Sequence, residues 1–336
     1  MSSTPTEAEI AQDARWLTQA FDPAAKLVRL IAMTADNYRS ASFLDDRMVQ
    51  QPVEAVLVPW ATVAAAAAGI TRTDARWIFH IGHVGSTLVA RLLGELPTVL
   101  SVREPRFLRD LAALGPDDRK AIVPLARALF SRSFGASQTA LVKATSFVSE
   151  IAAELVPPDG RALFLYAAPR HYIASILAGD NSVRELHALA PARARRMAGR
   201  VPDIRPPRND AERAAAAWAC EMTSLEAASE ALPNARILWL DFDRMLDDVG
   251  GCLRRTANDL AIDASAGKLA ALAASPLLTR YSKAPEHGYS AELRHDLIAE
   301  SAAHFASDID GALDLLAQSA ETSPSLAQAL SRAGEN

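Results

Sequence analysis

The sequence predicts an α/β fold, in which helices cover both faces of a parallel sheet between a helical N-terminal region and a helical C-terminal region. Five short apolar segments are the main observation, and they span residues 77–79, 99–102, 140–142, 162–166 and 237–240. Each is too short for a helix and is followed by helical spacing, which is typical of parallel strands buried on both faces. At 336 residues, half of them hydrophobic, the chain can form one large domain or a domain with a subdomain.

The first 75 residues are expected to form a mainly helical lead-in. The apolar residues of the 16–31 stretch are interrupted by Asp22-Pro23, which predicts a helix start there. Residues 55–70 are uncharged and rich in alanine, but they are fewer than the roughly 20 that a membrane span needs. Buried packing is therefore expected. Asp45 and Asp46, beside Arg47, are expected to form a cap or an ion pair with Arg47 rather than a metal site.

The remainder, residues 76–336, is expected to form the α/β domain. Its first strand leads into a loop that contains Gly82 and Gly85, and apolar residues at helical spacing then continue to Pro97. A junction of this kind directs free backbone N–H groups and the positive end of a helix dipole at one point, which favours an anion such as phosphate. Ser86 and Thr87 can cap the helix or bind phosphate oxygens. The alternative is an ordinary glycine turn, because short glycine motifs are weak signals.

The loop departs from the nucleotide-binding motif of kinases. If Thr87 occupied the last Ser/Thr position of that motif, Ser86 would stand in place of the lysine and His80 in place of the first glycine. Without that lysine the loop lacks the main cation that ATP chemistry uses at the β- and γ-phosphates.

The loop resembles that of the sulfotransferases that use 3′-phosphoadenosine 5′-phosphosulfate (PAPS). Their phosphosulfate loop reads roughly aromatic-x-[Lys/Arg]-Ser-Gly-Thr-Thr, and here His83-Val84-Gly85-Ser86-Thr87 stands at that place. The segment is most similar to bacterial sulfotransferase-family proteins with a loop of the form HIGHxGST. Arg103-Glu104-Pro105 looks like the family's Glu-Pro element, and residues 239–246 look like its late Tyr-Glu-Asp-Leu strand exit. The resemblance covers about residues 76–260.

The resemblance implies a P-loop-type sheet, PAPS as co-substrate, no metal, and transfer of a sulfuryl group to a hydroxyl or amine acceptor that the sequence does not identify. The donor-binding residues would be Gly82, His83, Val84, Gly85, Ser86, Thr87 and Leu88. The catalytic residues would be His83, Glu104 and Lys143.

Each catalytic residue has an expected role. His83 takes the position of the loop Lys/Arg and would donate to the leaving oxygen, although histidine is only partly charged near neutral pH. Glu104 would act as the base that removes the acceptor proton; the alternative is a structural pair with Arg103 or Arg106. Lys143 would contact the sulfate.

The 3′-phosphate site departs from the family pattern. Relatives have Arg-x-Pro and a serine eight residues after the arginine; Pro169 and Ser175 fit this frame, but Ala167 stands in place of the arginine. Arg170, three residues further on, is expected to reach the phosphate together with Ser175.

Residues 191–210 form an Arg/Pro-rich segment that predicts a helix end at Met197 followed by a loop. Its six arginines are Arg193, Arg195, Arg196, Arg200, Arg205 and Arg208. It is interpreted either as a lid that supplies guanidinium groups to a phosphate or an anionic acceptor, or as a solvated basic loop. Residues 211–232 and the tail 264–336 are expected to be helical. Within the tail, the polar 280–287 segment is a candidate to fold back over the site.

The charge and the cysteine content of the chain restrict its expected binding partners and location. A net charge of −5 and a pI of about 5.8 argue against bulk nucleic-acid binding. Cys220 and Cys252 lack metal-type partners, so we expect buried thiols in a reducing compartment and no zinc site. The N-terminus lacks the features of a secretory signal, and a cytoplasmic location without an integral membrane segment is expected.

Two other functions stay open at this stage. The first is a divergent P-loop phosphotransferase or NTPase, which would use Asp241 or Asp243 as a magnesium ligand. The second is a nucleotide-binding P-loop protein without catalysis. The oligomeric state cannot be derived from the sequence.

Overall fold

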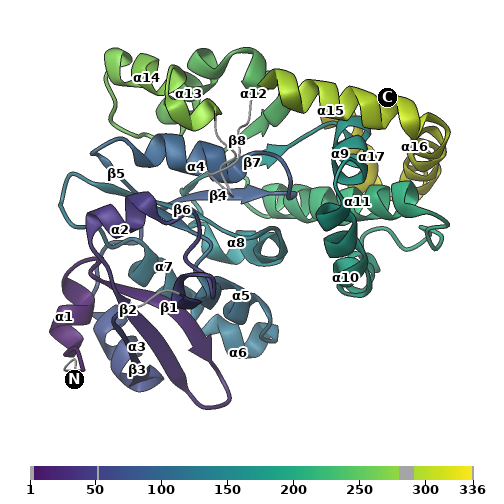
Figure 1. Ribbon diagram of the computed structural model, residues 1–336. Helices are drawn as coiled ribbons and strands as arrows, with labels where there is room; N and C mark the ends of the chain where they lie inside the picture. The colour runs from purple at the N-terminus through teal and green to yellow at the C-terminus, as the bar shows by residue number, and fades with distance from the viewer. Residues whose placement is uncertain (1–3, 51–52, 280–290, 335–336) are drawn as a thin grey trace.

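The computed structural model describes residues 4–50, 53–279 and 291–334, and its main feature is a five-stranded parallel sheet with helices on both faces (Figure 1). The order across the sheet is β5-β6-β4-β7-β8, with every neighbouring pair parallel. The strands are β4 Arg76–His80, β5 Val99–Arg103, β6 Thr139–Lys143, β7 Arg161–Tyr166 and β8 Arg236–Asp241. The predicted fold class and all five predicted strands are confirmed.

Aromatic side chains join the three neighbouring strands β4, β7 and β8 on one face of the sheet. Phe164 of β7 meets Phe79 of β4 edge-on at 5.8 Å and Trp239 of β8 at 5.1 Å between ring centroids. Such edge-to-face pairs contribute beyond the apolar area that they bury. They fix the side-by-side placement of the strands whose ends carry the candidate site.

The strand order places a topological switch point between β4 and β7. After β4 the chain moves to β5 at one edge, and after β7 it moves to β8 at the other. The connections that follow the neighbouring strands β4 and β7 therefore diverge. In open α/β sheets, ligands bind at this switch point, beyond the carboxyl ends of the strands.

Helices α4, α13 and α14 lie on one face of the sheet, and α8 and α11 lie on the other (Figure 1). Helix α11 is the main support of its face: Trp218 is fully buried, and its indole N–H donates to the carbonyl of Ala167 at 2.9 Å. The helices of the α/β part are α4 Ser86–Gly94, α5 Arg106–Ala112, α6 Pro116–Lys120, α7 Val123–Phe130, η2 Ser146–Ile151, α8 Ala152–Leu155, α9 Pro169–Leu177, α10 Asp180–Met197, α11 Asp210–Glu230, α12 Phe242–Asp247, α13 Val249–Asp259 and α14 Ala266–Ala273.

The described C-terminal residues are helical, as predicted: η3 Pro276–Thr279, α15 Ala291–His304, α16 Ala306–Ala320 and α17 Pro324–Ala333. These helices pack on α9 and α11. Ser301 donates to the carbonyl of Ala174 at 2.9 Å, and Arg332 pairs with Glu226 at 2.5 Å. The 280–287 segment, a candidate to cover the site, lies outside the described residues.

The prediction of a mainly helical lead-in over residues 1–75 is wrong. Three strands, β1 Trp16–Asp22, β2 Leu27–Ala32 and β3 Ala55–Pro59, form an antiparallel sheet in the order β1-β2-β3. Strand β1 is buried on both faces except at its last residue, so it lacks the alternation that marks a strand in sequence. Asp22-Pro23 begins a hairpin turn, in which the Asp22 carboxylate accepts from the N–H groups of Ala24 and Ala25.

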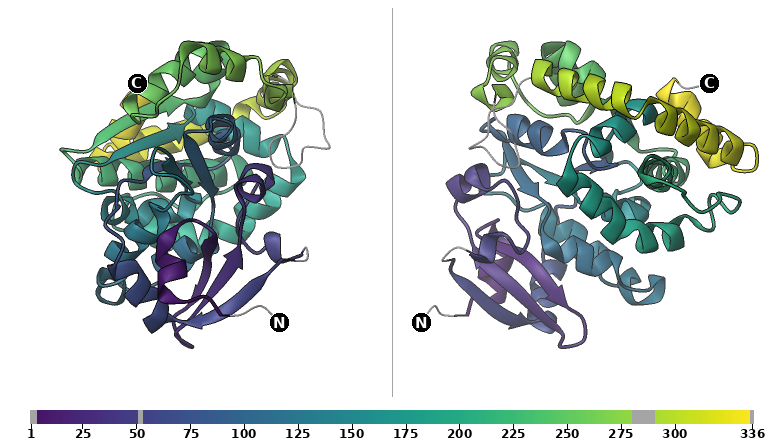
Figure 2. Two further views of the ribbon diagram at one scale, coloured as in Figure 1. Left: turned by 90° about the vertical axis from the view of Figure 1, so that its left-hand side faces the viewer. Right: turned by 45° about the vertical axis from the view of Figure 1, so that its right-hand side comes forward.

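Short helices surround this small sheet, and they are α1 Glu7–Gln12, α2 Ala35–Ser40, η1 Met48–Gln50 and α3 Trp60–Ala68. The sheet lies as a separate layer at one end of the molecule (Figure 2). Polar contacts attach strand β1 of this sheet to the rest of the chain. The N–H of Phe21 donates to Asp110 on α5 at 2.9 Å, and the buried Arg132 donates to the carbonyl of Trp16 at 2.9 Å.

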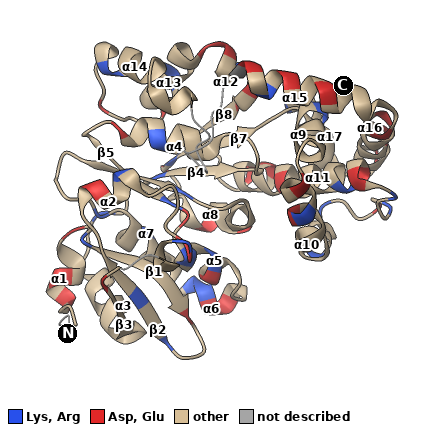
Figure 3. Cartoon of the chain, viewed as in Figure 1, with Lys and Arg blue, Asp and Glu red and all other residues tan. Residues whose placement is uncertain are grey.

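Charged residues of both signs are spread over the elements of the chain (Figure 3). In the described ranges no helix combines the length and the apolar character that a membrane crossing requires. Cys220 is buried, as expected, and burial raises the pKa of its thiol to about 12; Cys252 is half-buried.

Candidate functional site

The loop after β4 has an unusual backbone. Gly82, His83 and Gly85 all have positive φ, at 84°, 54° and 62°. Gly85 is required for a second reason, because a Cβ atom at this position would lie 1.9 Å from the ring of Phe242. The glycine thus permits both the left-handed turn and the close approach of α12 to the loop.

His80, the last residue of β4, holds the loop in place. Its Nδ1 accepts from the N–H of Gly82 at 2.9 Å, and its Nε2 lies 3.0 Å from the carbonyl of Ala144. Because Nδ1 accepts, the ring proton belongs on Nε2, which donates to Ala144. This buried ring therefore links the loop to the segment after β6. Sequence reasoning treated His80 only as a departure from the kinase motif, although a polar residue that ends an apolar strand was a signal.

The N-terminus of α4 begins at a residue that cannot cap it with a side chain. Its N-cap residue is Gly85, and among the residues that the structure describes no side-chain cap hydrogen bond is present at the first turn. The first N–H groups of a helix have no partner within the helix, so this turn presents donors together with the positive end of the dipole. Ser86 and Thr87 are both buried here, at 5% and 3% exposure. Val84 and Leu88 belong to the core, so only their backbone can face a ligand.

Thr87 adds a second, independent observation. Within the described part of the chain its buried Oγ1 atom has no hydrogen-bond partner, and the same holds for Oγ1 of Thr145 after β6. Buried hydroxyls in native structures are nearly always paired, so an unpaired one at the start of a helix calls for a ligand or water.

Glu104 and Lys143 form an ion pair at the carboxyl ends of β5 and β6. Lys143 Nζ donates to Glu104 Oε1, and the two side chains are 1% and 12% exposed. Arg47 approaches the other carboxylate oxygen at 3.5 Å and pairs with Asp45 at 2.6 Å. The expected ion pair between Arg47 and an aspartate is confirmed.

The alternative prediction for Glu104, a pair with Arg103 or Arg106, is wrong. Arg103 is fully buried and donates to the carbonyl of Ala41 at 2.9 Å, so it points away from the sheet edge. Arg106 binds Asp46 and Asp110 instead.

Glu104 also has a strained backbone, with φ of 56°. A left-handed conformation is uncommon for a residue other than glycine and costs on the order of 1 kcal/mol or more. Its N–H donates to the carbonyl of Lys143 at 2.7 Å, which holds the turn. Residues held in this way cluster at functional sites.

His83 faces a carboxylate at longer range. Its Nε2 lies 3.9 Å from Glu185 Oε2 on α10, and its side chain is 18% exposed. The sequence predicts that His83 supplies the positive charge of the loop after β4, and in the structure its side chain faces α10.

The structure does not bring Arg170 and Ser175 together. Both lie on α9, five residues apart, which places them roughly 140° apart around the helix axis. Ser175 donates to the carbonyl of Tyr172 at 2.8 Å, whereas Arg170 pairs with Asp310 on α16 at 2.7 Å. The Arg170 pair is exposed.

A cluster that sequence reasoning missed borders the loop. Arg294 on α15 donates to Asp243 at 3.1 Å, and His171 Nδ1 lies 3.1 Å from the other oxygen of this carboxylate. The hydrogen bond that His171 donates to the Asp243 carboxylate raises the pKa of His171. Arg294 also lies over the ring of Phe242 at 5.1 Å, and this ring covers Gly85.

Asp241 and Asp243 had been considered as magnesium ligands. Asp241 caps α12 by accepting from the N–H of Asp243 at 2.9 Å, and Asp243 belongs to the cluster with Arg294 and His171. In the described ranges no group of three or more His, Cys, Asp or Glu side chains is arranged around a common point suited to a metal ion.

Five of the six arginines in the arginine-rich segment pair with acids, so for these five neither the lid of free guanidinium groups nor the solvated loop is correct. Helix α10 ends at Met197, as predicted, and Arg193 and Arg196 on its last turns bind buried or half-buried acids. Arg193 and Arg196 share Glu221 at 3.1 and 2.8 Å. The remaining pairs join Arg196 and Arg200 to Glu150, and Arg205 and Arg208 to Glu212.

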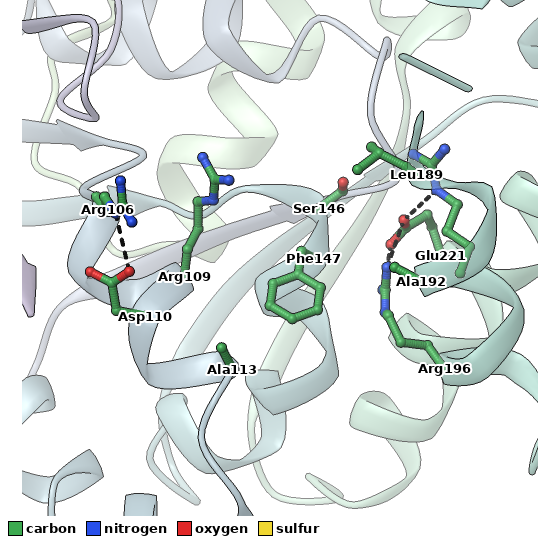
Figure 4. Close-up of a pocket in the computed structure, with 11 residues that line it drawn as sticks. Arg106, Arg109, Asp110, Ala113, Ser146, Phe147, Leu189, Ala192, Arg196 and Glu221 are labelled. Atoms are coloured by element: carbon green, nitrogen blue, oxygen red, sulfur yellow. Dashed lines mark hydrogen bonds and ion pairs between the residues drawn. The ribbon is translucent and has the colours of Figure 1, made fainter. Parts of the chain in front are cut away.

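A pocket of about 270 Å³ opens between α5, η2, α10 and α11 (Figure 4). Arg106 and Arg109 lie on one side of the Phe147 ring, and Glu221 and Arg196 lie on the other. Two of its walls begin directly after the catalytic candidates, because Arg106 follows Glu104-Pro105 and Ser146 follows Lys143 by three residues.

No family model matches the chain, and no curated protein matches it. Among solved structures, a sulfotransferase domain from the curacin biosynthetic pathway aligns with 14% identity and a TM-score of 0.38. That alignment covers 67% of this chain and 87% of the other. At this identity and TM-score the likeness supports no functional inference.

Proposed function

We propose that this chain is a sulfotransferase-like enzyme that transfers a sulfuryl group from PAPS to a hydroxyl or amine acceptor. One observation supports this most. The N-terminus of α4 follows β4, and in the described residues it has no side-chain cap and the Thr87 hydroxyl has no partner. The Glu104–Lys143 pair lies at the carboxyl ends of β5 and β6, the two strands on one side of β4. An anion site and an acid–base pair thus share one sheet edge.

The loop residues suit the phosphosulfate end of the donor. The N–H groups of the first α4 turn, together with the hydroxyls of Ser86 and Thr87, would hold its oxygens. His83 would add a proton donor where relatives have Lys or Arg. Backbone donors of this kind are preorganised, so they need no rearrangement as charge develops on the leaving phosphate.

Glu104 is the proposed base. The acceptor oxygen or nitrogen forms a bond to sulfur, and its proton passes to Glu104. The bond between sulfur and the bridging oxygen breaks, and its electron pair stays on the leaving phosphate. Lys143 orients the Glu104 carboxylate and places positive charge near the sulfate oxygens.

Arg170 is the proposed partner of the 3′-phosphate, without help from Ser175. Its ion pair with Asp310 is exposed and therefore contributes little, so a phosphate can replace the carboxylate. Arg294, held near Gly85 by Phe242 and Asp243, is a second cation on the same side of the loop.

A substitution of Thr87 tests the donor site. Thr87→Val removes a hydroxyl that has no hydrogen-bond partner among the described residues, so the free energy of unfolding should stay unchanged or rise. Affinity for 3′,5′-adenosine bisphosphate should fall roughly ten- to a hundredfold, because a hydrogen bond to a charged oxygen is lost. Urea unfolding and isothermal titration calorimetry measure the two quantities.

The control is Ser224→Ala on α11, which removes another buried hydroxyl without a hydrogen-bond partner in the part of the chain that the structure describes. It should have the same small effect on stability and none on bisphosphate affinity. Equal affinity in Thr87→Val and the parent would place the nucleotide elsewhere.

A further inference from the structure

The pocket between α5, η2, α10 and α11 contains more arginine than its acids neutralise. Arg106, Arg109, Arg193 and Arg196 line it, together with Asp110 and Glu221. Glu221 is 1% exposed and holds Arg193 and Arg196, and Asp110 holds Arg106. The pocket is thus a built polar site, with a rigid ion pair on one wall.

Arg109 differs from the other three. Within the described part of the chain no hydrogen bond or ion pair joins its guanidinium to another side chain. Its positive charge contributes, after Arg47, to the lowered pKa of Asp45. It projects beside Arg106 on the same side of the Phe147 ring (Figure 4). Its fork of N–H donors is therefore available for a planar anion.

The rest of the pocket is suited to an apolar body. The ring of Phe147 lies under the Arg196 guanidinium at 5.2 Å, and Leu189 of α10 is 39% exposed beside it. A volume of about 270 Å³ is just below the usual range of ligand pockets, which favours a small molecule with one ring.

From these contacts we propose that this pocket binds the acceptor, and that the acceptor is a small amphipathic molecule with a carboxylate, phosphate or sulfate group that Arg109 holds. Its apolar part packs on Phe147 and Leu189, and its reactive hydroxyl or amine points toward Glu104. The sequence positions support this orientation of the acceptor. The lining residue Arg106 follows Glu104 by two positions, and the lining residue Ser146 follows Lys143 by three. The assignment of an acceptor rests on the proposed sulfuryl transfer.

The test uses 4-hydroxyphenylacetate and its neutral counterpart 4-hydroxyphenylacetamide as probes, in ligand-observed NMR titrations of the full chain without any donor. We expect the carboxylate to bind at least about tenfold more tightly than the amide. Arg109→Ala should remove this preference. Arg254→Ala, which deletes an exposed arginine on α13, should keep it.

The possible outcomes distinguish anion binding in this pocket from the proposed sulfuryl transfer. If Arg109→Ala keeps the preference, or if neither probe binds, the pocket does not recognise an anionic acceptor and the inference is overturned. If the preference depends on Arg109 but the protein binds no 3′,5′-adenosine bisphosphate, the anion pocket stands and its role in sulfuryl transfer falls.

Discussion

At the scale of single residues, the site depends on groups whose ordinary partners are missing or unusual. The hydroxyl of Thr87 is buried and has no hydrogen bond to any described residue. Glu104 has a left-handed backbone, and its carboxylate lies between Lys143 and Arg47. Sequence reasoning singled out Glu104 and Lys143 through the family resemblance, and the structure places them together because β5 and β6 are neighbouring parallel strands that end at one edge. It missed Arg294, because no motif surrounds this residue and only the packing of α15 brings it to Asp243.

Replacing Glu104 by glutamine tests its role as base. The amide oxygen can still accept from Lys143, so affinity for 3′,5′-adenosine bisphosphate should be kept. Release of the bisphosphate from PAPS in the presence of a phenol acceptor should slow by about 10²- to 10⁴-fold, because the proton acceptor is gone.

Glu95→Gln, at the exposed end of α4, is the matched control and should retain the parental rate. If Glu104→Gln also reacts at the parental rate, Glu104 is not the base. If it loses nucleotide affinity together with rate, its contribution is structural.

At the scale of elements, the arginine-rich segment shows how a charge run can be misread. Five of its arginines bind Glu221, Glu150 and Glu212, and these ion pairs hold the segment after α10 in place. Glu150 on η2 and Glu221 on α11 are distant in sequence from the arginines they bind, so the sequence could not reveal these pairs. Glu212, in contrast, stands only four residues after Arg208, at the spacing of a helical i,i+4 pair. The small N-terminal sheet was missed for a different reason, since burial of both faces of β1 hides the period of a strand.

Glu212 should make stability depend on pH. Hydrogen bonds from Arg205, and then from Arg208, lower the pKa of Glu212 below its ordinary value of 4.5. A carboxyl with a lowered folded-state pKa stabilises the protein above its unfolded-state pKa, and this contribution is lost as the pH falls below about 4.5.

At pH 7, Glu212→Gln should lower the free energy of unfolding by about 1.5–3 kcal/mol, as measured by urea denaturation. The difference from the parent should shrink as the pH falls from 5 to 3. Glu230→Gln, at the exposed end of α11, should show no such trend. If the difference in the free energy of unfolding stays constant over this pH range, the ion pairs of Glu212 with Arg205 and Arg208 do not stabilise the protein through the Glu212 charge.

At the scale of the whole molecule, the strand order brings the loop after β4 and the helix after β7 to one switch point at the carboxyl edge of the sheet, while the N-terminal unit reaches the same edge through Arg47. The fold class and the five strands could be predicted, because short apolar runs followed by helices leave few other arrangements. The pocket could not, since α5, η2, α10 and α11 meet only in the folded chain.

The most direct test of the central claim is calorimetric titration of the intact protein with PAPS, 3′,5′-adenosine bisphosphate and ATP, each with and without magnesium. The account predicts that PAPS and the bisphosphate bind at one site without magnesium, and that magnesium does not strengthen ATP binding, because the loop lacks the lysine of ATP-binding motifs. Tight ATP binding that requires magnesium, with no binding of the bisphosphate, would contradict it and favour a phosphotransferase.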